Sequence, residues 1–441
     1  MKMHMTTNPR IFLSAGEASG DAYGASLIKA LREHLPEARF TGLGGEQMDR
    51  AGQERVVKAE DVAVMGMTEI LRHIPHIYLS YRRLVARIRR EQPDIAILID
   101  FPDVNFRLAK HLHKAGVPVV WFVSPQLWAW KRGRLRWVQE RVDKMLVIFP
   151  FEEAFYRSRG VDAEFLGHPL SELQVPIMTR ESYAALHNLD PAKTWIALLP
   201  GSRWKEIRAN LPTMHELAMS DLITSSAAYT TFDGDTTVQP SDPAAHTKYE
   251  FLLPVASTID AKDLQHYIGE LNIEPLKYFG PEASSLRLTL VSEAREALFH
   301  ARASAVASGT ATVLAAIVGN PFVVVYRVSA LTFAVAKKLV AYPEELPVTK
   351  DSAGNLPVAM VNLIAGDWIV PELLQDRFTA TNLATALGRI LVDGPERDAQ
   401  IADLADVRRK LSVPCLNGLA SSPIQRAADV ILAMLQEQGS G

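Results

Sequence analysis

Residues 94–116 read DIAILIDFPDVNFRLAKHLHKAG, and this stretch decides the fold. An apolar run ends at Asp100, and a helical pattern of apolar positions follows it. The same order of apolar strand and amphipathic helix recurs in both halves of the chain. Nearly continuous apolar strands that alternate with helices are typical of a parallel sheet covered on both faces. The sequence therefore predicts an α/β fold.

Two acids, Asp100 and Asp103, stand where the apolar strand ends. Carboxylates rarely occupy such a place without a partner or a function. In parallel sheets ligands bind beyond the carboxyl ends of the strands, so these acids are expected at a ligand site. No His or further carboxylate clusters beside them in the sequence, and a metal is therefore not expected.

The strand pattern restarts after FLGHPL at 165–170, which predicts two doubly wound domains that face a central cleft. The expected N-terminal domain covers residues 1–168, and the C-terminal domain covers residues 169–441. The last helices of the chain could pack back on the first domain. Residues 224–247 and 341–357, rich in turn-forming residues, are predicted to be surface loops.

Composition narrows the class of protein. The chain has 441 residues, too many for one small core, and its net charge of −3 gives no reason to expect a nucleic-acid partner. Its one cysteine, Cys415, excludes an intramolecular disulfide framework and is expected to be a packing residue. No secretory signal is expected. The uncharged stretch 303–326 is broken by SGT and GNP, so it is predicted to be a buried helix followed by a buried strand of a soluble protein.

The first strand leads into the turn SAGEASGDAYG at 14–24. Small residues, Ser19 and Gly20 among them, would let a ligand approach the backbone, and a helix start offers N–H donors. Glu17 and Asp21 lie in the same turn. Helix capping by Ser19 or Asp21 explains the pattern equally well, and both interpretations stay open.

Two turns in the second half resemble anion sites. LLPGSRWKEI places Ser202 and Arg203 before a helix, where guanidinium and amide groups can both donate to phosphate. ASGTATVLAAI offers the hydroxyls and amides of residues 308–310 (Ser308, Gly309 and Thr310). The alternative interpretation of residues 202–203 is a surface turn, and that of residues 308–310 is close packing of the helix on the strand. Together the turns favour a nucleotide diphosphate, whereas the partial glycine pattern GLGGEQ and the lack of a P-loop motif disfavour NAD and ATP.

Two further segments have open interpretations. WFVSPQLWAWKRGR joins three tryptophans to a basic cluster, which fits stacking on a base or sugar as well as a buried rim with solvated arginines. The basic amphipathic segment 64–90 could lie on anionic lipid or form a core helix with a solvated face.

The chain resembles the lipid-A-disaccharide synthase family over nearly its whole length, apart from the two expected loops. The matching strings are AGEASGD, VMGMTEIL, LIDFPDVNFRLAKHLHKAG, VSPQLWAWKRGR, FPFEEAFY, FLGHPL, LLPGSR, SGTAT, VVVYR, and VNLIAG followed by VPELLQ. The resemblance implies a GT-B fold of two Rossmann-like domains, with the nucleotide-sugar mostly on the C-terminal one. It also implies an enzyme at the inner face of the cytoplasmic membrane, and it allows a homodimer.

The implied reaction is an inverting glycosyl transfer. UDP-2,3-diacylglucosamine and 2,3-diacylglucosamine 1-phosphate would give the β-1,6-linked disaccharide 1-phosphate and UDP. A base takes the proton of the acceptor 6-hydroxyl, and donors rather than a metal cofactor meet the charge on the leaving diphosphate.

The resemblance also assigns residues. Asp100 matches the family's essential aspartate and is the preferred base, with Glu17 as second candidate. Asp103 would cap the next helix or orient its neighbours, beside the acceptor-side turn of Ser19 and Gly20. Arg203 and the helix start at 308–310 would hold the diphosphate, and Asn362 matches a position associated with the nucleotide.

The chain departs from the family at the expected nucleotide site. Leu314 replaces a glutamate that holds the ribose, Val361 precedes Asn362 where proline is usual, and Asp367 replaces an arginine. Loss of a ribose contact would cost about 1–3 kcal/mol of binding. Two alternatives follow: a UDP-sugar epimerase of the same architecture, or a non-catalytic family member that binds glycolipid.

Overall fold

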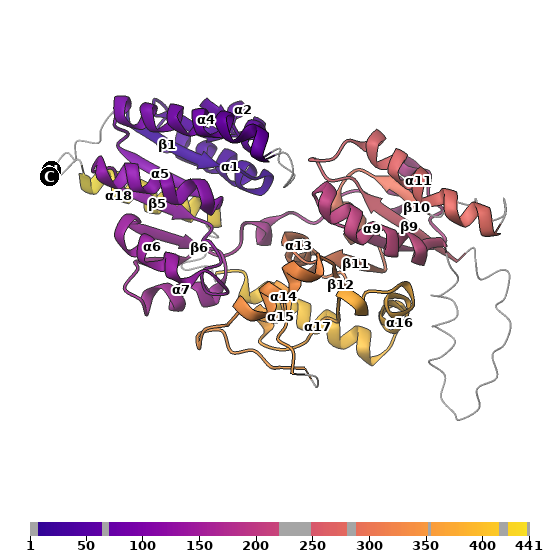
Figure 1. Cartoon of the computed structure of the whole chain (residues 1–441). Helices are drawn as coiled ribbons and strands as arrows, with labels where there is room; N and C mark the ends of the chain where they lie inside the picture. The colour runs from indigo at the N-terminus through magenta and orange to yellow at the C-terminus, as the bar shows by residue number, and fades with distance from the viewer. Residues whose placement is uncertain are drawn as a thin grey trace. The chain divides into compact units, whose positions relative to one another are not determined.

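The computed structural model describes residues 8–63, 70–219, 248–279, 288–351, 354–413 and 422–438. The chain divides into two compact units (Figure 1). Unit 1 comprises Met1–Glu172, Leu339–Leu346 and Leu411–Gly441, and unit 2 comprises Leu173–Lys338 and Pro347–Lys410. Cys415, the expected loop 224–247 and residues 64–69 of the basic segment lie outside the described residues.

Unit 1 contains a parallel sheet with the strand order β3-β2-β1-β4-β5-β6-β7 in the described residues. The strands are β1 Arg10–Ala15, β2 Arg39–Gly44, β3 Gln53–Lys58, β4 Ile95–Ile99, β5 Val119–Phe122, β6 Lys144–Val147 and β7 Ala163–Phe165. Every residue of β4 is buried, because helices cover both faces of the sheet. The predicted parallel α/β architecture is confirmed for this unit.

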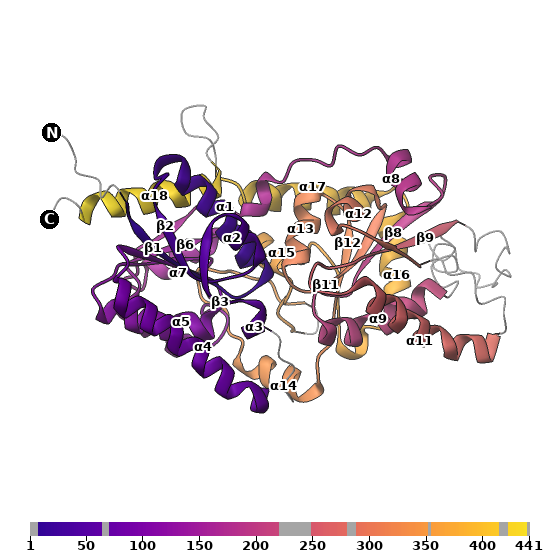
Figure 2. The ribbon, with the colours of Figure 1, turned by 90° about the horizontal axis from the view of Figure 1, so that it is seen from above.

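The helices of unit 1 form two layers around the sheet. They are α1 Ala18–His34, α2 Glu46–Arg50, α3 Glu60–Ala63, α4 Ile70–Glu91, α5 Pro102–Lys114, α6 Leu135–Arg141, α7 Pro150–Arg157 and α18 Pro423–Gln438. Helices α4 and α5 lie on one face of the sheet, and α1 with α18 lies on the other (Figure 2). The last helix therefore packs within the first unit of the chain.

Unit 2 repeats the plan with the strand order β10-β9-β8-β11-β12-β13. Its strands are β8 Thr194–Leu199, β9 Tyr249–Pro254, β10 Leu288–Val291, β11 Ala303–Ala307, β12 Phe322–Tyr326 and β13 Glu372–Leu374. Its helices are α8 Arg180–His187, α9 Trp204–Met219, α11 Ala261–Phe279, α12 Ala294–His300, α13 Thr310–Val318, α14 Ala330–Leu339, α15 Met360–Ala365, α16 Ala380–Leu391 and α17 Pro395–Lys410. Helices α9 and α16 cover one face, while α13 and α17 cover the other (Figure 2).

The prediction for the uncharged stretch 303–326 was wrong in its first half. It contains a strand, β11, before helix α13 and strand β12. Three of the five residues of β11 (ASAVA) are alanines, which have high helix propensity, but β11 pairs with β8 on one side and β12 on the other, and every residue is buried. Burial and pairing override the local preference of such a run.

The partial glycine pattern GLGGEQ begins inside a strand. Gly42 lies within β2 with φ +147°, and a Cβ there would stand 1.9 Å from the carbonyl oxygen of Leu13. This close approach of β1 and β2 accounts for the glycine.

Candidate functional site

The carboxyl ends of β1 and β4 form the point in unit 1 where the chain direction across the sheet reverses. These strands are neighbours, with Ala15 opposite Ile99, and the helices that follow them lie on opposite faces. The turn with Glu17 and the turn with Asp100 therefore lie side by side. Open α/β sheets bind ligands at such switch points.

Asp100 sits in an unusual backbone turn. Asp100 has φ +44° and Phe101 has φ +48°, so two consecutive residues other than glycine are left-handed. Each such residue costs about 1–3 kcal/mol, and strain of this kind persists only where surrounding contacts hold it. The Phe101 ring lies over Gly16, where a Cβ would stand 2.4 Å from it. Gly16 is therefore required by this ring.

The sequence analysis missed one residue that contacts this turn and a second that lies near Asp100. The buried side chain of Asn105, in the first turns of α5, bonds the backbone at Asp100 and the hydroxyl of Ser14. Burial, with the nearby charge of Asp100 as a second cause, raises the pKa of Tyr23 on α1. An asparagine inside a helix has low helix propensity, and this was the available signal for Asn105.

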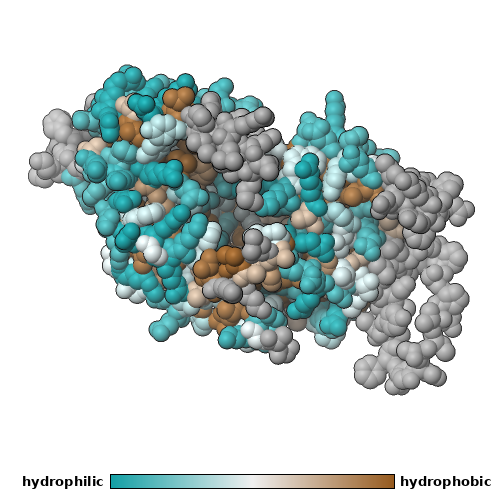
Figure 3. Space-filling model, in the orientation of Figure 1, coloured by the Kyte–Doolittle hydropathy of each residue, from teal (hydrophilic) through white to brown (hydrophobic). Residues whose placement is uncertain are grey.

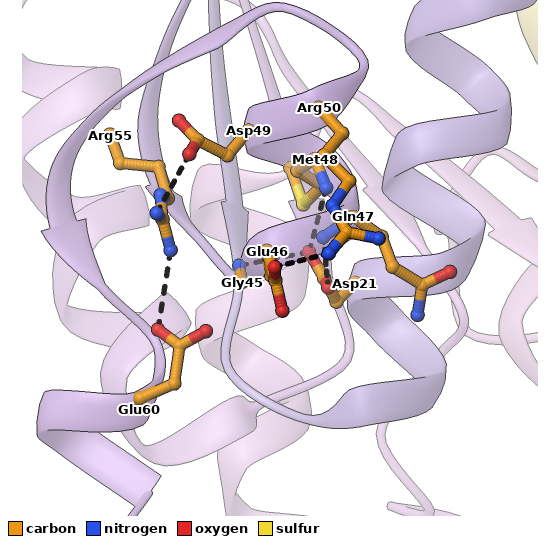
Figure 4. A network of polar contacts seen from close by, with 9 residues as sticks. All are labelled: Asp21, Gly45, Glu46, Gln47, Met48, Asp49, Arg50, Arg55 and Glu60. Atoms are coloured by element: carbon orange, nitrogen blue, oxygen red, sulfur yellow. Dashed lines mark hydrogen bonds and ion pairs between the residues drawn. The ribbon is translucent and has the colours of Figure 1, made fainter. Parts of the chain in front are cut away.

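The acids of the first turn have separate roles. Asp21 is buried, and its carboxylate accepts hydrogen bonds from the backbone N–H groups of Gly45, Gln47 and Met48 at distances of 2.8, 2.9 and 3.1 Å (Figure 4). It therefore caps α2 rather than its own helix. Glu17 is the half-buried N-cap residue of α1 and makes no side-chain cap bond there.

Ser19 and Gly20 lie in the first turn of α1. Ser19 is partly exposed, whereas Gly20 is buried, and a Cβ on Gly20 would stand 3.4 Å from Cβ of Ala15 and 3.6 Å from the Ile99 side chain. Close packing of α1 on the sheet thus accounts for Gly20 without a ligand.

Asp103 is not the N-cap of α5, since Phe101 occupies that position. The capping alternative was wrong because the chain enters the helix two residues earlier, through the left-handed turn. The exposed Asp103 carboxylate instead pairs with Arg134 at 2.9 Å. It thereby joins the start of α5 to residues 124–134, which we call the tryptophan loop.

A buried acid, Glu152, stabilises the tryptophan loop through hydrogen bonds. Glu152 accepts hydrogen bonds from Ser124 Oγ at 2.6 Å and Trp128 Nε1 at 3.0 Å. Burial raises the pKa of Glu152 to about 7, against the opposing effect of these donors. Trp121 and Trp128 are buried, so the buried-rim interpretation fits them, whereas Trp130 is 42% exposed with Lys131 Nζ 4.0 Å from its ring centre.

Unit 2 has a corresponding switch point between β8 and β11. Leu199 pairs with Val306, and α9 and α13 leave these strands toward opposite faces. Ser202 and Arg203, both exposed, follow β8. The structure therefore brings the two anion-site candidates, residues 202–203 and 308–310, to one edge.

The two turns at this edge differ in how their N–H groups are used. The carboxylate of Glu206 accepts a hydrogen bond from Ser202 N at 2.9 Å, so an acid already occupies the start of α9. Helix α13 begins at Thr310 after the exposed Gly309, which has φ +150° and no side chain; of this turn, Ser308 N already donates to the carbonyl oxygen of Val325 at 3.0 Å. Its first turn is the better anion site of the two. Leu314 lies one turn further along α13 and is partly exposed.

Asn362 has a structural role. Its buried side chain donates to the carbonyl oxygen of Val370 at 3.0 Å and to Glu372 at 2.9 Å, and it accepts from Ile369 N and Val370 N. These bonds join α15 to β13. Its predicted contact with a nucleotide stays a prediction.

Other features of the described residues lie apart from these edges. A surface hollow of ≈ 670 Å³ beside β13, α16 and α17 contains none of the predicted site residues. Across the described ranges, no group of three or more His, Cys, Asp or Glu side chains is arranged to hold a metal ion. Within the same ranges, no helix has the length and apolar character needed to span a membrane.

Comparison with known sequences gives one consistent result. The family model for lipid-A-disaccharide synthetase matches residues 11–231 and 272–413. The lipid-A-disaccharide synthase of Acidobacterium capsulatum is 48% identical over 437 residues, which cover 99% of both chains. That of Koribacter versatilis is 44% identical over 430 residues, or 97% of this chain and 99% of the relative.

Solved structures share the fold at low identity. The glycotransferase of kitacinnamycin is 14% identical with a TM-score of 0.55, over 97% of this chain and 99% of that one. S. aureus MnaA, solved with UDP, is 13% identical with a TM-score of 0.55, over 98% and 96% of the two chains. These likenesses confirm the predicted GT-B fold and say nothing of the reaction.

Proposed function

The chain belongs to the lipid-A-disaccharide synthetase family, and from that premise we propose that it transfers diacylglucosamine from UDP to 2,3-diacylglucosamine 1-phosphate. The products are the β-1,6-linked disaccharide 1-phosphate and UDP. The observation that carries this proposal is the 48% identity to a lipid-A-disaccharide synthase over 99% of the chain. The switch point of unit 1, with Asp100 and Glu17 on adjacent turns, supports the proposal, because such a transfer needs a general base.

In the proposed step, the acceptor 6-hydroxyl oxygen attacks the anomeric carbon of the donor sugar. The bond from that carbon to the UDP oxygen breaks, and its electron pair leaves with UDP. Asp100 takes the hydroxyl proton as general base, and Glu17 is the second candidate for this role. Attack opposite the leaving group inverts the anomeric centre.

The leaving diphosphate gains negative charge as the bond breaks. Arg203 and the start of α13 at Ser308, Gly309 and Thr310 are the proposed donors, because guanidinium and helix N–H groups both stabilise an oxyanion. We propose that no metal cofactor is required. Turnover that survives chelation with EDTA would support this, and turnover that stops and returns with Mg²⁺ would contradict it.

We also propose that the protein lies on the inner face of the cytoplasmic membrane. Helix α4 exposes Tyr78 (58%) and Leu79 (52%) beside the exposed Arg82 and Arg83. Figure 3 shows a mainly hydrophilic surface with a second apolar group over α14, where Val335 is 47% exposed. Each arginine near an anionic surface contributes about 1 kcal/mol. Charge reversal at Arg82 and Arg83 should weaken sedimentation with anionic vesicles; unchanged sedimentation would oppose this surface.

One assay separates the proposed reaction from its alternatives. Purified protein is incubated with both acylated sugars in detergent, and UDP and disaccharide are quantified together. Equal release of UDP and disaccharide is expected. An isomerised UDP-sugar without disaccharide would indicate an epimerase, and bound glycolipid without turnover would indicate the non-catalytic member that Leu314 suggests.

A further inference from the structure

Asn105 is buried between the carboxyl ends of β1 and β4. Neither Asn105 nor Ser14 has any exposed surface. The Ser14 hydroxyl donates to Oδ1 of Asn105 at 2.6 Å. Nδ2 of Asn105 donates to the carbonyl oxygens of Asp100 at 2.7 Å and Ile99 at 3.2 Å, with that of Ser14 at 3.4 Å. One amide thus contacts both strand ends.

These bonds fix the backbone on each side of Asp100. The carbonyl of Ile99 belongs to the peptide plane before Asp100, and the carbonyl of Asp100 belongs to the plane after it. Asp100 N donates in addition to the carbonyl of Phe122 at 3.1 Å. Since both planes are held, φ and ψ of Asp100 are held, and the direction of its Cβ follows from them.

The backbone here needs such support. The left-handed conformations of Asp100 and Phe101 would relax without it, because residues other than glycine disfavour this region. A buried amide with several partners is costly to disrupt, since removal leaves buried carbonyl groups unpaired. These contacts can therefore hold the strained backbone conformation of Asp100, the acid at the end of β4.

We propose that Asn105 is a positioning residue that aims the Asp100 carboxylate at the acceptor hydroxyl. Its partner Ser14 anchors the amide to β1, the strand that leads to Glu17. This inference rests on the proposed function, in which Asp100 is the base. Asn105 itself touches no substrate in this role.

The chain provides a matched control in unit 2. Ser304 Oγ donates to Oδ1 of the buried Asn320 at 2.5 Å, and Nδ2 of Asn320 donates to the carbonyl of Ala301 at 2.9 Å. The bond between serine and asparagine repeats that of Ser14 and Asn105, although Nδ2 of Asn320 has one carbonyl partner where that of Asn105 has three. Asn320 precedes β12, however, and so lies at the amino-terminal edge of its sheet, opposite the carboxyl edge that carries residues 202–203 and 308–310.

The test compares Asn105→Ala with Asn320→Ala in the disaccharide assay. At a temperature where both variants are folded, Asn105→Ala should lower kcat about a hundredfold with both KM values nearly unchanged, because misplacement of a reacting group acts on the chemical step. Asn320→Ala should lower the Tm to a similar degree and keep its kcat. Equal kcat in the two variants would overturn the proposal.

A double-mutant cycle shows whether Asn105 acts through Asp100. In an Asp100→Asn background, Asn105→Ala should cause no further loss of kcat. A full additional loss would overturn the proposed route. If Asn105→Ala fails to fold, Ser14→Ala removes only the hydroxyl and should still lower kcat about tenfold; unchanged kcat in that variant would count against the proposal.

A crystal structure of Asn105→Ala gives a readout independent of activity. Asp100 and Phe101 should leave positive φ in the variant. If the wild type forms no disaccharide, the proposed function fails, yet this structure still shows whether Asn105 holds the turn. If the wild type is active and the variant keeps both the turn and kcat, only the positioning role fails.

Discussion

The switch points of the two units share a topology but are built from different residues. At the edge of unit 1, left-handed backbone falls on Asp100, Phe101 and Val123, none of which is glycine. At the edge of unit 2 it falls on Gly201 and Gly309 at the switch point and on Gln375 after β13. The first edge is held by a buried network in which Asn105 bonds both strand ends, whereas the second has exposed turns and a single buried amide bond, from Asn210 Nδ2 to the carbonyl oxygen of Pro200 at 2.8 Å.

This difference separates two ways to use the same fold. A general base must be aimed within a fraction of an ångström, and a strained turn fixed by buried bonds can do that. An anion is bound by several N–H groups at once, and glycine lets its oxygens approach the backbone. Substitutions at the first edge should therefore affect kcat, and those at the second edge should affect binding of the UDP-sugar.

The largest effect is expected for Asp100→Asn. Amide replacement removes the base and keeps the shape of the side chain, so kcat should fall about 10²–10⁴-fold. Binding of UDP, measured by calorimetry, should stay unchanged. The control is Asp103→Asn, which loses an exposed ion pair with Arg134 and should retain most activity. Unchanged turnover in Asp100→Asn would transfer the role of base to Glu17.

The sequence could predict the edge of unit 1 because its signal is local. An apolar run that stops at an acid specifies β4, its direction and the place of Asp100. Contacts between distant residues could not be inferred in the same way. Ser14 and Asn105 are 91 positions apart, and Asp21 caps a helix that starts more than 20 residues later.

The edge of unit 2 was less predictable for another physical reason. The alanines of β11 give no strand signal, and only pairing with β8 and β12 makes that segment a strand. Unless β11 is recognised as a strand beside β8, the sequence does not show that the turns at 202–203 and 308–310 are adjacent. Asn362 was singled out by resemblance, but its side-chain bonds to β13 required the structure.

The next largest effect is expected for Arg203→Ala at the edge of unit 2. Loss of a charge-assisted bond should raise the KM for the UDP-sugar about 10–100-fold, with a smaller change in the KM for the acceptor. The control is Arg208→Ala, which removes an exposed arginine from α9, the helix that begins directly after Arg203. If the KM for the UDP-sugar is the same in both variants, Arg203 is a solvated surface residue and α13 alone would be left as the anion site.

A gain of binding is expected for Leu314→Glu. The substitution restores the carboxylate that the family places in this helix, and Leu314 is partly exposed, so the charge need not be buried. A bidentate ribose contact should tighten UDP binding about tenfold in calorimetry. Leu314→Gln should give a weaker gain. Equal or weaker binding of UDP by Leu314→Glu would show that the ribose is held elsewhere in this chain.

A last effect concerns the stability of unit 1 rather than its turnover. Glu152 bonds the tryptophan loop much as Asn105 bonds the Asp100 turn, but unlike Asn105 it can ionise. Burial raises the pKa of Glu152 from 4.5 to about 7. The folded state therefore binds an extra proton between these values, and the stabilisation present below pH 4.5 is lost as pH rises through 7. The free energy of unfolding of the wild type, relative to Glu152→Gln, should decrease by about 3 kcal/mol from pH 4.5 to 8. Urea unfolding checks this, with Glu153→Gln as the control on the same helix, and a difference that does not vary with pH would mean that Glu152 stays ionised.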